Sequence, residues 1–245
     1  MSRARTHAAA LVAHYAAHGR RRRLPWRDPT EGIGRATLVE GLLAVTGAAQ
    51  VAAAYPRIFA GVTGADWLAV PAAERDARVG LLGLPGQKRA AVDALAFALW
   101  TQDRAALAPE RLVAEPGIGP YIAGMVGLLH GFHAAPVDCN VERVAARAST
   151  AAPARWVGAI LRAAAALPDI DGRPAPYAAI SAVLDLGAGP CGLGAPECER
   201  CPLCHCRSRG VGAQRLLAFF SDGYILGFTD TRSRCNVEPL TGGQQ

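Results

Sequence analysis

The sequence predicts an all-α protein, and two observations support that prediction. Alanine, leucine and valine dominate its 245 residues, whereas aromatic residues make up only 6%, and such a composition favours helices. Up to residue 209, no segment shows the alternation of apolar and polar residues that a half-buried sheet requires. The length suits one large domain or two small ones.

The expected helices follow from apolar spacing and from breaks at glycine and proline. The first one, for example, places Leu11, Val12 and Tyr15 at helical spacing. Breaks are expected at residues 83–86 and 116–119, which read GLPG and PGIG. In chain order, the expected helices cover residues 6–18, 35–59, 73–82, 87–100, 109–114, a segment from about 121, 140–149, 154–166 and 175–186.

The last part of the chain differs in character. Residues 211–245 are richer in aromatic and β-branched residues and end in polar ones. They are interpreted as a strand pair or a disordered tail, and they are too few to form a substantial core of their own.

The charge is unevenly distributed. Residues 1–28 carry seven arginines and one aspartate, a balance of +6 that equals the net charge of the whole chain. The sequence therefore predicts a basic N-terminal arm next to a neutral body, which suits a polyanionic partner. No apolar run reaches the length of a membrane span and no signal-peptide pattern opens the chain, so we expect a cytoplasmic protein. In that compartment clustered cysteines indicate metal ligands rather than disulfides.

Residues 115–129, EPGIGPYIAGMVGLL, join a glycine-rich turn to the start of a helix. Backbone N–H groups at such a turn suit a phosphate, and Gly117 and Gly119 are the expected contacts. An ordinary helix–turn–helix corner is the alternative. About twenty residues later, Asp138 directly precedes a helical run, where an N-cap is its simplest structural role.

Taken together, residues 116–144 resemble the helix-hairpin-helix and Gly/Pro…Asp signature of base-excision DNA glycosylases. The resemblance implies that the hairpin binds the DNA backbone and that Asp138 faces the deoxyribose of a flipped-out base. Cleavage of an N-glycosidic bond creates oxocarbenium character on the sugar, which a nearby carboxylate stabilises.

Two further segments resemble the adenine glycosylases of the MutY type and the related thymine/guanine mismatch glycosylases. Residues 20–30, RRRRLPWRDPT, match their N-terminal motif, with Arg27 as an expected DNA contact. A tryptophan anchored in a loop beside surface arginines is the alternative. Glu40 lies where those families carry a catalytic glutamate, and burial would raise its pKa so that it can protonate a departing purine. An exposed position on a solvated helix face is the alternative for Glu40.

The chain departs from the adenine branch in several places. Residues 44–47, AVTG, replace a glutamine-rich segment that enters the DNA stack, and only Thr46 matches it as an expected DNA contact. Residues 83–90, GLPGQKRA, look more like the thymine/guanine branch, with Gln87 expected at the DNA. Tyr121 also fits that branch and is a further expected DNA contact. The lack of a C-terminal domain for 8-oxoguanine is expected on the same grounds.

The position of the lysine distinguishes nicking from non-nicking members of this superfamily. Members that cleave the strand share a lysine in the first turn after the hairpin, and this lysine forms a Schiff base with the sugar. Here that turn holds Pro120 and Tyr121, and Lys88 is the only lysine of the chain. The resemblance therefore implies a monofunctional enzyme without lyase activity.

Five cysteines lie within residues 191–206, CGLGAPECERCPLCHC. Four thiolates suit a [4Fe–4S] cluster or a structural zinc ion, and the compact run favours the cluster. Cys191, Cys198 and Cys201 match the spacing of the family's iron–sulfur loop. The family's fourth cysteine would lie at position 207, which is an arginine here, and Cys206 is nearer to that position than Cys204.

The whole resemblance runs from Leu11 to Cys206 and implies two helical lobes with a DNA cleft between them. A six-helix module with the hairpin would cover residues 31–135, and a cluster lobe would combine residues 1–30 with 136–210. We expect a monomeric, monofunctional DNA glycosylase that excises a mismatched base from double-stranded DNA, with adenine opposite guanine or 8-oxoguanine as the first choice. A thymine or uracil/guanine glycosylase is the alternative, and a DNA-binding paralogue with weak or lost catalysis is a hypothesis of another class.

Overall fold

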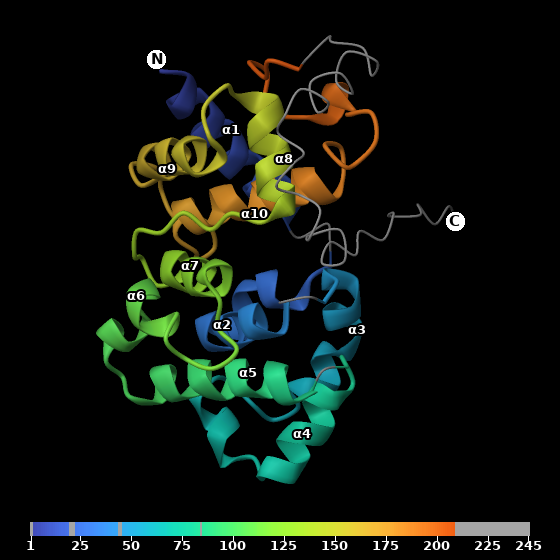
Figure 1. The fold of residues 1–245 in the computed structure, drawn as a ribbon, viewed down its shortest axis with the longest axis vertical. Coiled ribbons are helices and arrows are strands. Elements are labelled where there is room, and N and C mark those ends of the chain that lie inside the picture. The colour runs from blue at the N-terminus through green and yellow to red at the C-terminus, as the bar shows by residue number, and fades with distance from the viewer. Residues whose placement is uncertain (1, 20–22, 44–45, 84, 209–245) are drawn as a thin grey trace.

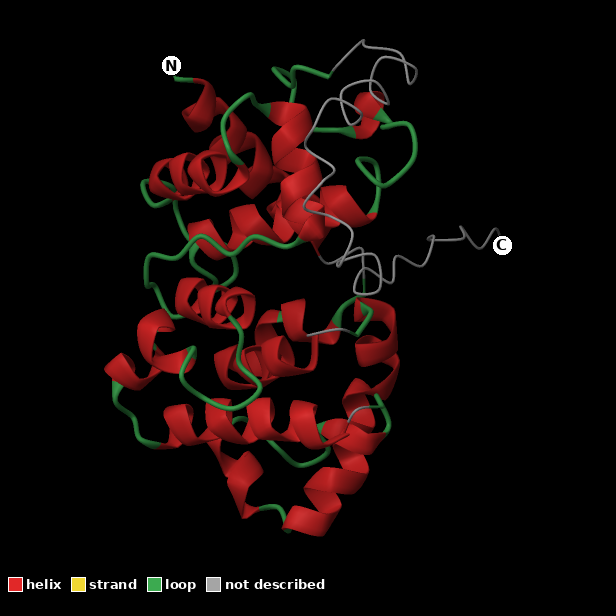
Figure 2. Ribbon diagram, in the orientation of Figure 1, coloured by secondary structure: helices red, strands yellow, loops and turns green. Residues whose placement is uncertain are grey.

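The computed structural model describes residues 2–19, 23–43, 46–83 and 85–208, so the tail expected over 211–245 lies outside the described residues. Within these ranges the chain is mostly helical and contains no β-strand, apart from an isolated bridge between Ile170 and Arg173 (Figure 2). The prediction of an all-α protein is confirmed.

The described ranges contain α-helices and a few short 3₁₀ turns (Figure 1). The α-helices of the described ranges are α1 (Arg3–His18), α2 (Gly32–Leu43), α3 (Ala48–Ile58), α4 (Ala72–Gly80), α5 (Pro85–Trp100), α6 (Pro109–Leu112), α7 (Pro120–Leu129), α8 (Cys139–Ala148), α9 (Pro153–Ala164) and α10 (Ala175–Ala188). The 3₁₀ turns are η2 (Pro25–Arg27), η3 (Pro29–Glu31), η4 (Ala65–Ala69), η5 (Arg104–Leu107) and η6 (Cys198–Arg200).

The first helix packs against helices from the second half of the chain. Helix α1 contacts α9 and α10, and α8 packs on the same two helices, as the upper part of Figure 1 shows. Helices α2 to α7 pack among themselves below, and α10 also contacts α7. The division into a 31–135 module and a cluster lobe remains a prediction.

The helical stretch expected over 35–59 is two helices rather than one, which corrects that prediction. Helix α2 ends at Leu43 and α3 begins at Ala48. Between them the amide of Thr46 donates to the carbonyl of Leu43, and Gly47 adopts an extended backbone as the N-cap of α3. The extended N-cap starts a separate helix. The apolar spacing of the sequence continues across this break and therefore does not reveal it.

None of the helices in the described ranges combines the length and the apolarity that crossing a membrane requires.

Candidate active site

The hairpin between α6 and α7 lies directly on α5. Gly117 has φ +79°, and a Cβ there would lie 2.7 Å from the carbonyl oxygen of Gln87 and 3.0 Å from the amide nitrogen of Ala91. Only glycine fits such a backbone and such a close approach. The structure therefore brings Gly117 and the exposed Gln87 together. Gly119, the exposed N-cap of α7, has open space at its Cβ position, so no steric contact requires glycine there.

Asp138 is the N-cap of α8. Its Oδ1 accepts from the amide of Val141 at 2.7 Å, and its Oδ2 accepts from Asn140 Nδ2 at 3.1 Å. The structural role expected for this aspartate is thus present. Because the side chain is only half-buried, the cap also holds a carboxylate in a fixed orientation at the positive end of a helix.

Glu40 is buried on α2, with 2% of its surface exposed. The hydroxyl of Tyr177 donates to Glu40 Oε1 at 3.1 Å. Burial raises the pKa of Glu40 to about 7, although the Tyr177 hydrogen bond and the charge of Arg27 act in the opposite direction. A carboxyl group with that pKa is half protonated near neutral pH, which suits a general acid. An exposed position for Glu40 is excluded.

Tyr121 lies within electrostatic range of both acids. It lies in the first turn of α7, and burial together with the negative charges of Asp138 and Glu40 raises its pKa. A side chain that feels both carboxyl groups lies within electrostatic range of both. The structure therefore brings Tyr121, Glu40 and Asp138 into one neighbourhood, although they come from α7, α2 and the start of α8.

Arg27 does not lie at a DNA-accessible surface, which corrects the expectation that it contacts DNA. Its guanidinium is buried, with Nη1 donating to Asp185 Oδ2 at 2.5 Å and Nη2 to Asp185 Oδ1 at 2.9 Å. The same group lies over the ring of Tyr15 at 5.4 Å. A buried guanidinium requires such a paired carboxylate, so this arginine connects the N-terminal motif to α10.

We expect Asp185→Asn to destabilise the fold by about 3–5 kcal/mol, because it leaves the buried charge of Arg27 without its partner. Glu74→Gln is the control, since Glu74 pairs with Arg78 at a half-exposed site, and such pairs contribute less than about 1 kcal/mol. Urea unfolding of both variants checks the prediction. Equal midpoints for Asp185→Asn and wild type would contradict it.

The remaining DNA-contact candidate, Thr46, is half-buried between α2 and α3. Lys88 is 3% exposed, and its Nζ donates to the carbonyls of Leu82 and Gly83 at 3.0 and 3.2 Å. The single lysine is therefore engaged in the loop that precedes α5.

The cysteine segment forms a pocket next to α8. Cys191, Cys198, Cys201 and Cys206 all line it, together with Arg147, whereas Cys204 is exposed and does not line it. Among the described residues, no three His, Cys, Asp or Glu side chains are arranged to hold a single metal ion as they stand. The structure thus brings together the four cysteines expected as ligands and leaves Cys204 outside.

Two arginines of α8 bind the cysteine segment. Arg143 donates to the carbonyls of Cys191 and Gly187 at 3.1 and 2.8 Å. The buried Arg147 donates to the carbonyls of Cys191 and Gly192 at 3.0 and 2.8 Å. Because Asp138 caps the N-terminus of α8, the helix that binds the cysteine segment is also the one that presents the carboxylate.

Sequence reasoning missed Tyr177, Asp185 and the two arginines. Arg143 and Arg147 are four residues apart on a predicted helix, so their shared face was a usable signal. Tyr177 and Asp185 meet Glu40 and Arg27 across more than a hundred residues, and nothing local marks them.

Known proteins that are similar to this chain are DNA glycosylases. No protein-family profile matches the chain. The adenine DNA glycosylase of Mycolicibacterium smegmatis is 33% identical over 198 residues, covering 78% of this chain and 66% of the relative. The adenine DNA glycosylase of Mycobacterium tuberculosis is 32% identical over 207 residues, covering 78% and 64%. The chain thus spans slightly less than two thirds of these relatives. A thermostable thymine-DNA glycosylase shares the fold, with a TM-score of 0.61 at 23% identity over 82% of this chain and 93% of that one.

Proposed function

Because the chain belongs to the helix-hairpin-helix base-excision DNA glycosylases, we propose that it is a monofunctional glycosylase that removes adenine opposite guanine or 8-oxoguanine. One observation carries the proposal. Glu40 is a buried acid with a pKa of about 7, and Asp138 is a helix-capping carboxylate. Both lie close enough to Tyr121 to raise its pKa. The identity to two adenine DNA glycosylases supports adenine as the base.

In the proposed reaction the two acids have different tasks. Protonated Glu40 donates its proton to the purine, and the bond between the purine and the sugar breaks with its electron pair leaving on the base. The sugar is left with oxocarbenium character, which the Asp138 carboxylate stabilises until water adds. The hydrogen bonds from Val141 and Asn140 hold that carboxylate in one orientation.

DNA binding is proposed for the hairpin and its surroundings. The loop with the half-buried Gly117 and the exposed Gly119 would bind backbone phosphates through N–H groups, and Gln87 adjoins it on α5. Thr46 remains a proposed DNA contact. The substrate base must leave the duplex to reach two acids that are buried or half-buried.

We propose that the cysteine pocket holds a [4Fe–4S] cluster, and zinc is the alternative. Cys191, Cys198, Cys201 and Cys206 would hold it, since all four line one pocket and a cubane cluster takes four thiolates. Such a group would cross-link the cysteine segment within itself. Arg143 and Arg147 already attach this segment to α8. The proposed chemistry at the base uses protein side chains alone.

We predict that the protein releases the base without cutting the strand. Lys88 is engaged by two carbonyls, and Pro120 and Tyr121 occupy the turn where a Schiff-base lysine would be needed. An end-labelled duplex incubated with the protein should therefore be cut only after added alkali. Cutting without alkali, or a covalent adduct trapped by borohydride that disappears in Lys88→Met, would contradict the prediction.

Four duplexes distinguish the candidate substrates: adenine opposite 8-oxoguanine, adenine opposite guanine, thymine opposite guanine and uracil opposite guanine. The proposal expects the fastest release from the two adenine duplexes. Residues 83–90 favour the thymine/guanine alternative, in which the two guanine mismatches with pyrimidines would react faster. Tight binding to all four without release would indicate a paralogue that has lost catalysis.

We further propose that the protein acts as a monomer on double-stranded DNA in the cytoplasm. Light scattering of the protein with and without a short duplex tests the monomeric state.

A further inference from the structure

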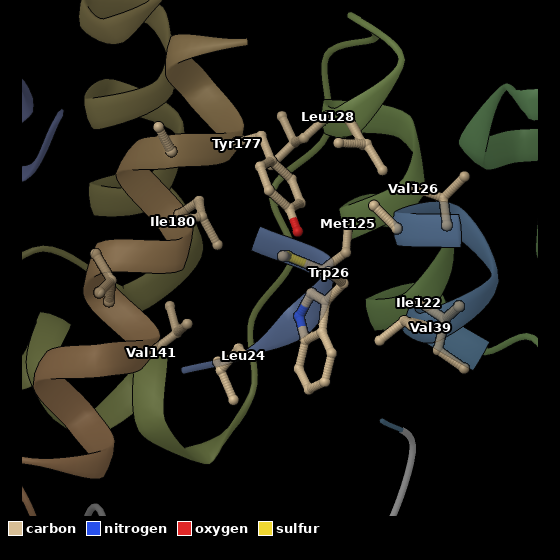
Figure 3. Close-up of a cluster of buried hydrophobic side chains, with 14 of the residues drawn as sticks. Leu24, Trp26, Val39, Ile122, Met125, Val126, Leu128, Val141, Tyr177 and Ile180 are labelled. Atoms are coloured by element: carbon tan, nitrogen blue, oxygen red, sulfur yellow. The ribbon is translucent and has the colours of Figure 1, made fainter. Parts of the chain in front are cut away.

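Tyr177 is a second buried polar side chain next to Glu40. It lies near the start of α10, is 2% exposed, and donates its hydroxyl hydrogen to Glu40 Oε1 at 3.1 Å. Its ring lies in an apolar cluster with Trp26, Met125 and Leu128, and its hydroxyl end is directed toward Trp26 and Met125 (Figure 3). A tyrosine ring held this firmly presents its hydroxyl at a fixed point.

We propose that Tyr177 is the positioning residue of Glu40, and that its hydroxyl directs the acid's proton toward the leaving base. This inference rests on the proposed function. A protonated carboxyl group has one acceptor oxygen and one O–H donor. When Tyr177 occupies Oε1 as the donor, the proton of Glu40 is directed to Oε2, which is then free to donate to the purine.

The surroundings of Glu40 give the sign of the effect. Tyr177 from α10 and Arg27 from η2 lower the pKa of Glu40 against the effect of burial, and Tyr121 from α7 lies within range of the same carboxyl group. The charge of Arg27 is already paired with Asp185, and Asp138 acts on Tyr121. Loss of the Tyr177 hydroxyl therefore leaves burial less opposed and raises the pKa of Glu40.

The test is Tyr177→Phe, compared with Tyr55→Phe. Tyr55 is a matched control because it is also buried and also donates to a glutamate, with 2.7 Å to Glu31 Oε2. Single-turnover release of adenine is measured across pH. In Tyr177→Phe the rate at pH about 6 should fall by about tenfold, since one hydrogen bond that orients the acid is lost. The pH above which the rate falls should rise by about one unit. Tyr55→Phe should change neither.

Two further measurements separate the role of Tyr177 from the proposed function. In a Glu40→Gln background, Tyr177→Phe should cause no further loss; an equal loss there, or a pH profile that coincides with wild type, would overturn the proposal. Carbon-13 NMR of the Glu40 carboxyl in DNA-free protein reads the same shift without activity. If no duplex is processed but this titration moves upward in Tyr177→Phe, the proposed function fails while the contact stands. If Tyr177→Phe does not fold, 3-fluorotyrosine at position 177, a stronger donor, should move the profile to lower pH.

Discussion

Replacing Asp138 by asparagine is expected to reduce the single-turnover rate of base release by at least about 10³-fold, or about 4 kcal/mol of transition-state stabilisation. Asparagine is as good an N-cap as aspartate, so the amide should still accept from Val141 and α8 should keep its start. What is lost is the negative charge that, in the proposed reaction, stabilises the developing oxocarbenium ion. The loss should therefore appear in the rate and not in the stability.

Asp103→Asn is the matched control for this experiment. Asp103 caps η5 by accepting from the amide of Ala105 at 2.9 Å and is exposed, so the same chemical change occurs at a cap away from the acids. Its rate should equal that of wild type. An unchanged rate of base release in Asp138→Asn, with both variants folded, would contradict the mechanism proposed here.

Replacing Cys206 by serine is expected to abolish cluster binding, whereas Cys204→Ser should retain it. Cys206 lines the pocket, and its thiol donates to the carbonyl of Arg147 at 3.2 Å, while Cys204 is exposed and outside. A cluster needs four thiolates, and a metal centre that binds only the folded chain contributes its binding energy to folding. Cys206→Ser should therefore also unfold at a lower denaturant concentration.

This prediction is tested on the two variants by absorbance at about 400 nm, iron content and urea unfolding. Loss of absorbance and iron in Cys204→Ser, with both kept in Cys206→Ser, would reverse the assignment. Bound zinc without iron in wild type would favour the zinc alternative.

The site was partly predictable from the sequence, and the limits have physical reasons. Glu40 was expected to be buried because apolar residues surround it in the sequence, and burial is what raises its pKa. Asp138 precedes a helix, so its cap followed from local chemistry. Arg27 was placed wrongly, because a basic motif does not reveal a partner such as Asp185 that lies far along the chain.

The fold shows the same distinction between local and distant information. Apolar spacing predicted most helices, but it ran unbroken across residues 44–47 and hid the change of direction between α2 and α3. The packing of α1 against α9 and α10 is a long-range contact, and so is the hydrogen bond from Tyr177 on α10 to Glu40 on α2. No local periodicity encodes such contacts.

Direct identification of the released base tests most directly whether this chain acts as a DNA glycosylase. Wild-type protein is incubated in excess with a duplex that carries adenine opposite 8-oxoguanine, and free bases are measured by mass spectrometry. We predict stoichiometric free adenine and an intact strand until alkali is added. Tight binding of the duplex with no base released from it, or from the other three mismatches, would contradict the account.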